Sequence, residues 1–149
     1  MSEQAPLFLD RSLGAVVVAV ALREAGESVR VHDDHFAQDA PDEEWLPEVA
    51  RRGWIAVTKD NAIRRGFLQR LAVAQAGASL FVFTPGNMTG QEMAAALAAA
   101  APRIRLIASV QTAPFIATIQ ASGRVVVWRD RDALLEELQM AVGGHPRRR

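Results

Sequence analysis

The chain has 149 residues, half of them apolar, and its 17 basic and 17 acidic side chains give a formal net charge of zero. This composition predicts one globular domain with a substantial core, and the absence of cysteine excludes disulfide bonds and zinc–thiolate sites. The first residues lack the basic and apolar regions of a secretory signal, and the longest apolar runs are too short to span a bilayer, so we expect a cytoplasmic protein without membrane contact.

Strands and helices are predicted to alternate from the amino terminus to about residue 110. Apolar or alternating runs predict strands over 7–9, 28–31, 54–57 and 79–83. Helical patterns predict helices over 13–25, 42–52, 62–76 and 89–110. Ser12 is the expected cap of the first helix, and Thr89 with Glu92 forms a capping box for the last. Breaks are expected near Gly66 and at Pro102.

The last part of the chain predicts two strands, over 115–120 and 124–128, joined by a tight Ser122-Gly123 turn, and a helix over 130–142. The whole pattern favours an α/β fold in which a mainly parallel sheet carries helices on both faces and an antiparallel hairpin at one edge. We expect a single domain over residues 1–142 and a basic, disordered tail over 143–149.

The charges are segregated along the chain. Seven acids and no Lys or Arg lie between Val31 and Ala50, whereas six basic residues and a single acid, Asp60, lie between Arg51 and Arg70. Such segregation can focus an electrostatic field although the total charge is zero, but it is also typical of two solvated helix faces.

Acidic residues fall where the predicted strands end. Asp10 follows the first strand, Asp33 and Asp34 follow the second, and Asp60 follows the third, while Asp42 opens the helix that leads into the third strand. In open α/β sheets ligands bind outside the carboxyl ends of the strands, where the following helices also begin. We therefore expect these carboxylates at one edge of the sheet.

Carboxylates gathered at one edge repel each other and stay ionised when a cation lies among them. All-oxygen ligation suits Mg²⁺ or Mn²⁺, and such an ion activates water and stabilises charge on a phosphate. Asp42 lies three and four positions before Trp45 and Leu46 and shares their inward face, and Glu43 could turn to the same site. His32 and His35 are candidates for its rim. The basic side chains expected beside this edge, which could hold a polyanion, are Arg11, Lys59, Arg64 and Arg65. Each acid could also be a helix cap.

Three stretches together resemble PIN-like nuclease domains: Phe8-Leu9-Asp10, Asp42-Glu43-Glu44-Trp45-Leu46 and Val57-Thr58-Lys59-Asp60. His32-Asp33-Asp34-His35-Phe36 and Gly53-Trp54 are most similar to the branch named after VapC-type toxins of toxin–antitoxin systems. The resemblance covers residues from about 7 to 128. It implies a Rossmann-like three-layer α/β/α sandwich and cleavage of RNA that depends on a divalent metal. An antitoxin protein and a second copy of the chain, in a homodimer, are candidate partners.

By this resemblance, Asp10 corresponds to the first acid of the family, Asp42 or Glu43 to the second, and Asp60 to the third. Asp10, Asp42 and Asp60 would hold Mg²⁺ or Mn²⁺. The chain departs from the family at one point, because many members carry a further acid just after the third one, and here Asn61 follows. The alternative is therefore a PIN-like module that binds nucleic acid or protein without cleaving; a phosphate-accepting receiver domain fits the order of these residues poorly.

Overall fold

The computed structural model describes residues 5–143 of the chain. Within this range the strands are β1 (Leu7–Leu9), β2 (Val29–Val31), β3 (Ile55–Thr58), β4 (Ser79–Phe83), β5 (Phe115–Ile119) and β6 (Val125–Arg129). The helices are α1 (Val17–Glu24), α2 (Asp42–Arg51), α3 (Ala62–Arg65), α4 (Phe67–Ala76), α5 (Gly90–Val110) and α6 (Arg131–Gly143), with 3₁₀ turns η1 (Arg11–Leu13) and η2 (His32–Asp34). The predicted tail lies outside the described residues apart from Gly143, which ends α6.

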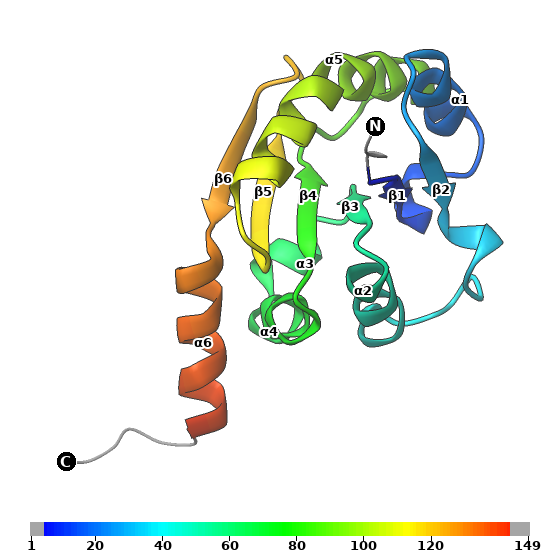
Figure 1. Cartoon of the computed structure of the whole chain (residues 1–149). Helices are drawn as coiled ribbons and strands as arrows, with labels where there is room; N and C mark the ends of the chain where they lie inside the picture. The colour runs from blue at the N-terminus through cyan, green and yellow to red at the C-terminus, as the bar shows by residue number, and fades with distance from the viewer. Residues whose placement is uncertain (1–4, 144–149) are drawn as a thin grey trace.

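The strands form one sheet in the order β2-β1-β3-β4-β5-β6, in which β6 alone is antiparallel to its neighbour. Helices α1 and α5 cover one face of the sheet, and α2, α4 and α6 cover the other (Figure 1). The predicted α/β/α sandwich with a mainly parallel sheet and a carboxyl-terminal edge hairpin is confirmed.

Alternate residues of each strand face opposite layers of the core. On β1, Leu7 and Leu9 pack into the cluster beneath α1 and α5, while Phe8 packs with Trp45 beneath α2. All three β1 residues are fully buried, as expected for a parallel strand covered on both faces. The pairing of β1 with β2 on one side and β3 on the other fixes the place of Asp10, the residue that follows it.

The first helix starts later than predicted. Residues 11–13 form the short turn η1, and Gly14 then adopts φ 77°, which the right-handed helix does not permit, so that α1 begins only at Val17. Ser12 is therefore not the cap of this helix, and its hydroxyl is free for another partner.

Pro102 does not interrupt α5, which runs through it to Val110. Its ring lies on the exposed side of the helix, where water can hydrate the carbonyl group that loses its N–H partner. The capping box of Thr89 and Glu92 at the start of α5 and the break at Gly66 are both present.

By length and composition, α5 is the one helix of residues 5–143 that is apolar enough to cross a membrane. Seven of its side chains are buried in the described fold: Met93, Ala94, Ala96, Leu97, Ala100, Ala101 and Ile104. These positions repeat with the helical period, which is typical of a helix that packs one face on a sheet.

Candidate active site

The carboxyl ends of β1 and β3 bring Asp10 and Asp60 to the same edge of the sheet. Leu9 pairs with Val57 in parallel register, so the residues that follow them, Asp10 and Thr58, lie side by side. Asp42 begins α2 at this edge as well. The three carboxylates line one pocket of about 300 Å³. Its other lining residues are Arg11, Ser12, His32, Ala40, Trp45 and Lys59.

Two hydroxyl groups hold the carboxylate of Asp10, which is 9% exposed. The Oγ1 of the fully buried Thr58 donates to Asp10 Oδ2 at 2.7 Å, and Ser12 Oγ donates to the same oxygen at 3.0 Å. Ser12 Oγ also accepts a hydrogen bond from the backbone N–H of Lys59 at 2.9 Å. Turn η1 and the end of β3 are thus connected by hydrogen bonds through Asp10 and Ser12. The sequence pattern did not indicate this connection.

Asp42 is not a helix cap. The cap position of α2 is Pro41, and the Asp42 side chain instead accepts a hydrogen bond at Oδ1 from the indole N–H of Trp45, at 3.0 Å. Burial raises the pKa of Asp42 above its ordinary value of 3.8, the Trp45 hydrogen bond lowers it, and the charges of Asp10, Asp60 and Glu43 raise it further. The ionised form is therefore costly here unless a cation is present.

Asp60 combines a role in the turn before α3 with a place in the pocket. Its Oδ1 accepts a hydrogen bond from the backbone N–H of Ala62 at 3.0 Å, and its own backbone N–H donates to Thr58 Oγ1 at 3.1 Å. Asp60 therefore holds the turn before α3, whose cap position is Asn61, and the Asp10 side chain makes no cap hydrogen bond to η1.

Each of the three carboxylates keeps one oxygen free of protein donors. Asp10 Oδ2, Asp42 Oδ1 and Asp60 Oδ1 are held as described above, while across residues 5–143 no protein hydrogen bond reaches Asp10 Oδ1, Asp42 Oδ2 or Asp60 Oδ2. One oxygen of each acid therefore fixes its orientation, and the other is available to a ligand.

A divalent cation that keeps part of its water shell fits this arrangement. Within the described range no three His, Asp or Glu side chains lie close enough together to hold an ion directly. Mg²⁺, however, usually keeps several waters and is bound through one or two carboxylates. The three carboxylates offer only oxygen atoms as metal ligands. The repulsion of the Asp42 charge by the neighbouring acids is of the kind that a bound cation relieves.

The family model described as "PIN like domain" matches residues 6–85, which include all three acids of the pocket. The chain belongs to the PIN-like domain family. A protein of Mycobacterium tuberculosis (strain ATCC 25618 / H37Rv) named "Putative ribonuclease VapC45" is 36% identical over 120 residues, covering 78% of this chain and 86% of that protein. No solved structure gives a significant match. The resemblance to the VapC-type branch of PIN-like domains is thus confirmed.

Several predicted residues of this PIN-like domain lie away from the pocket. Glu43 is exposed and does not line it, so α2 presents Asp42 and not Glu43 to the other acids. Asp33, Asp34 and His35 are exposed and do not line it either, and the His35 ring packs against Trp54. His32, the other histidine predicted near the rim, lines the pocket.

The basic residues of the PIN-like domain divide into two groups. Arg11 and Lys59 line the pocket. Arg64 does not, because its guanidinium donates to Asn61 Oδ1 at 3.1 Å and lies over the ring of Trp128. Arg65 is exposed on α3 and is also outside the lining. Arg11 and Lys59 are thus the basic side chains best placed to meet a phosphate beside the three acids.

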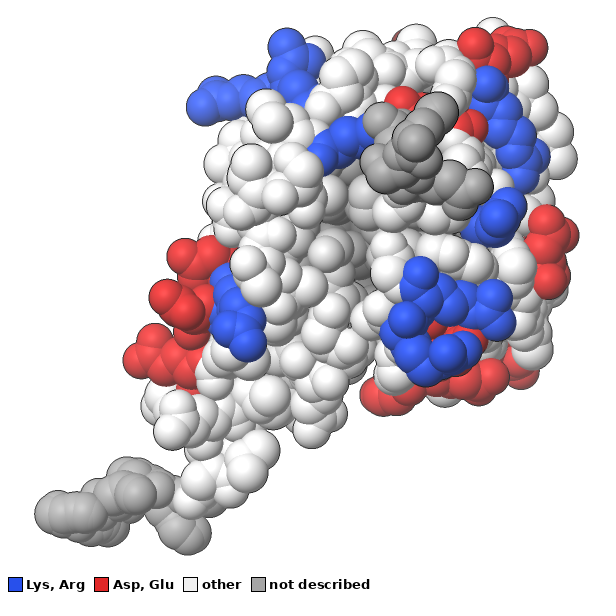
Figure 2. Space-filling view, in the orientation of Figure 1, with Lys and Arg blue, Asp and Glu red and all other residues white. Residues whose placement is uncertain are grey.

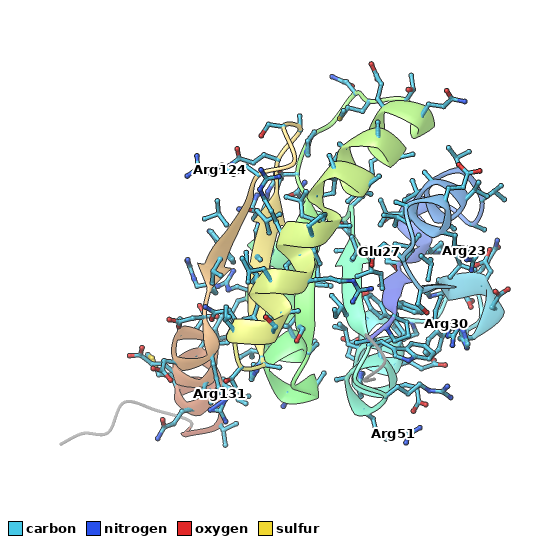
Figure 3. The ribbon with its side chains drawn as sticks, turned by 45° about the horizontal axis from the view of Figure 1, so that its top comes forward. Arg23, Glu27, Arg30, Arg51, Arg124 and Arg131 are labelled. Atoms are coloured by element: carbon cyan, nitrogen blue, oxygen red, sulfur yellow. The ribbon has the colours of Figure 1, made fainter. Side chains whose placement is uncertain are left out.

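A further basic patch lies at the far end of α2 from the pocket. Arg51 and Arg52 both pair with Glu48, whose pKa falls to about 2 through the hydrogen bonds from Arg51 and then Arg52. Arg30 and Arg52 lie over the ring of Trp54. Figure 2 shows basic side chains gathered on this side of the molecule, and Figure 3 shows Arg30 and Arg51 projecting outward there. The 10 residues of α2 span about 15 Å, so this patch does not belong to the pocket.

Proposed function

We propose that this PIN-like domain is a ribonuclease that depends on Mg²⁺ or Mn²⁺, and that it is the toxin of a toxin–antitoxin pair. The observation that carries the proposal is the convergence of Asp10, Asp42 and Asp60 on one pocket that Arg11 and Lys59 also line. The name of the mycobacterial relative, a ribonuclease of the VapC type, supports RNA as the substrate and an antitoxin as the partner.

Each side chain has a separate task in this proposal. The free oxygens of Asp10, Asp42 and Asp60 bind the ion, directly or through its waters. When bound, the ion supplies a Lewis acid that polarises the phosphate and makes water a better nucleophile. Lys59 and Arg11 attract the RNA phosphates and hold the strand beside the acids. Thr58 and Ser12 keep Asp10 in place through their hydrogen bonds.

A second candidate function is RNA or protein binding without cleavage. Asn61 stands where many PIN nucleases carry a further acid, and its side chain is used within the protein: it donates to the carbonyl of Thr84 at 3.4 Å and accepts from Arg64. This position therefore supplies no carboxylate to the pocket.

Cleavage of a mixed RNA pool with Mg²⁺, Mn²⁺ or EDTA separates the two functions. We expect shortened RNA with either metal and intact RNA in EDTA, because the three acids need a cation to act on a phosphate. Cleavage that continues unchanged in EDTA would contradict the metal mechanism. Intact RNA under all conditions, combined with RNA binding in a filter assay, would favour the binding module.

The salt dependence of RNA binding tests the role of the basic residues at the pocket. Replacing Lys59 and Arg11 with Gln should weaken binding. It should also flatten the log–log salt dependence by about 0.7 for each phosphate of single-stranded RNA that the protein no longer neutralises. The measurement is a salt titration of binding in EDTA, where no cleavage should occur. Arg51→Gln is the matched control, because Arg51 is exposed at the opposite end of α2. Equal slopes for the double variant and the control would show that Lys59 and Arg11 are only solvated charges.

A further inference from the structure

Trp45 lies one helical turn after Asp42 on the face of α2 that packs against the sheet. The residue is 1% exposed, and its indole N–H donates to Asp42 Oδ1 at 3.0 Å. A tryptophan this deeply buried usually finds a partner for its N–H group. Here the partner is an acid of the candidate metal site, and Trp45 itself lines the same pocket.

The indole ring is held on two sides by other aromatic rings. The ring of Phe8 lies 5.4 Å away at an interplanar angle of 30°, and the imidazole of His32 lies 6.3 Å away at 79°. Phe8 is on β1, which is paired on both sides, and is fully buried, and His32 is 2% exposed. Rotation of the indole would displace these neighbours, so its N–H group has one position relative to the sheet.

An N–H group in a fixed position selects one orientation of the carboxylate that it contacts. The hydrogen bond occupies Asp42 Oδ1 and leaves Oδ2 free of protein donors, as the hydroxyl groups of Thr58 and Ser12 leave Asp10 Oδ1 free. In both cases a donor on one oxygen orients the acid while its other oxygen is available. Residues that orient metal ligands from behind in this way typically change metal affinity or activity by about 10–100-fold when replaced.

We propose that Trp45 is a positioning residue, which orients the Asp42 carboxylate toward a divalent cation in the pocket. The proposal rests on the proposed metal-dependent function. It assigns to the indole nitrogen a role beyond packing. A phenyl ring at this position can keep an apolar contact with Phe8 but lacks the donor, and because it is smaller than indole it also leaves a cavity.

Calorimetric titration of Mn²⁺ into the wild type, Trp45→Phe and Trp54→Phe tests this role. Trp54 is the matched control: its ring also stacks near Phe8, at 6.0 Å, but it does not line the pocket. We expect Trp45→Phe to weaken Mn²⁺ binding by about 10–100-fold and Trp54→Phe to leave it unchanged. RNA cleavage by Trp45→Phe should recover when Mn²⁺ is raised by the same factor, which a general loss of structure would not allow.

The outcomes distinguish this proposal from the function on which it rests. Wild-type Mn²⁺ affinity in Trp45→Phe would overturn the positioning role and leave the metal-dependent function intact. A wild type that binds no Mn²⁺ would remove the proposed function and the positioning role together.

A second measurement applies if Trp45→Phe does not fold, because it uses the wild-type chain. In ¹⁵N-labelled protein, the indole N–H resonances can be assigned with Trp54→Phe and Trp128→Phe. During a Mg²⁺ titration we expect the Trp45 indole signal to move with the midpoint of metal binding, while those of Trp54 and Trp128 stay in place. A Trp45 signal that does not move while Mg²⁺ binds would overturn the proposal.

Discussion

Replacing Asp60 with Asn should abolish both RNA cleavage and the stabilisation of the protein by Mn²⁺. A ligand at about a hundred times its dissociation constant stabilises the folded state by roughly 2.7 kcal/mol, so the wild type should melt at a clearly higher temperature with Mn²⁺ than with EDTA. Asp60→Asn loses a carboxylate of the pocket, and its melting temperature should no longer respond to Mn²⁺.

In the absence of metal, the Asp60→Asn substitution should not lower the melting temperature and can raise it. The Asn side chain can still accept the hydrogen bond from the Ala62 N–H, so the local turn is kept. The charge of Asp60 is one cause of the raised pKa of Asp42. An acid whose pKa is raised on folding lowers the stability of the folded protein when it ionises. For Asp42 this destabilisation is absent at a pH below 3.8, its ordinary pKa, and present at neutral pH. In EDTA at neutral pH, Asp60→Asn should therefore melt at the same temperature as the wild type or higher.

Two further variants make the melting experiment decisive. Asp60→Ala should lose the turn hydrogen bond as well, at a cost of about 1 kcal/mol with or without metal. Asp39→Asn changes an exposed acid that does not line the pocket and should keep the full response to Mn²⁺. If the wild type itself does not respond to Mn²⁺, the three acids hold no metal ion, and the binding module becomes the better function.

Replacing Thr58 with Val should destabilise the protein by about 1.5–3 kcal/mol. The side chain is fully buried, and Val has nearly the same shape, so packing should change little. The substitution removes the donor at 2.7 Å from Asp10 Oδ2 and the acceptor of the Asp60 N–H at 3.1 Å. A hydrogen bond to a charged group contributes about 1.5–3 kcal/mol, and Asp10 would keep only Ser12 as a donor.

Urea denaturation measures this destabilisation, and the midpoint should fall while the slope is unchanged. The matched control is Thr118→Val on β5, because Thr118 is half-buried and its hydroxyl makes no side-chain hydrogen bond within residues 5–143. Comparable destabilisation of the two variants would mean that the general cost of a Thr→Val change in this sheet, and not the contact with Asp10, explains the result.

The succession of strands and helices along the chain, and the edge at which the acids meet, could be predicted from the sequence. Short apolar runs, each ending in polar residues, mark the strands, and parallel strands present their carboxyl ends at one edge. Asp10 comes directly after β1 and Asp60 comes two residues after β3, which predicts that both acids lie at the edge where the pocket is found. The capping box at Thr89 and the break at Gly66 are local signals of the same kind.

Tertiary packing decided which neighbouring side chains reach the pocket. The spacing of Asp42 before Trp45 and Leu46 favours it over Glu43 in the sequence, but both acids stayed candidates. The burial of Trp45 and Leu46 against the sheet fixes the rotation of α2 that turns Asp42 inward. Ser12 was an expected helix cap, but the positive φ of Gly14 delays α1 and leaves the hydroxyl to Asp10 and Lys59. A linear pattern carries the order of residues along the chain, whereas these assignments depend on how an element is rotated against partners that lie far away in the sequence.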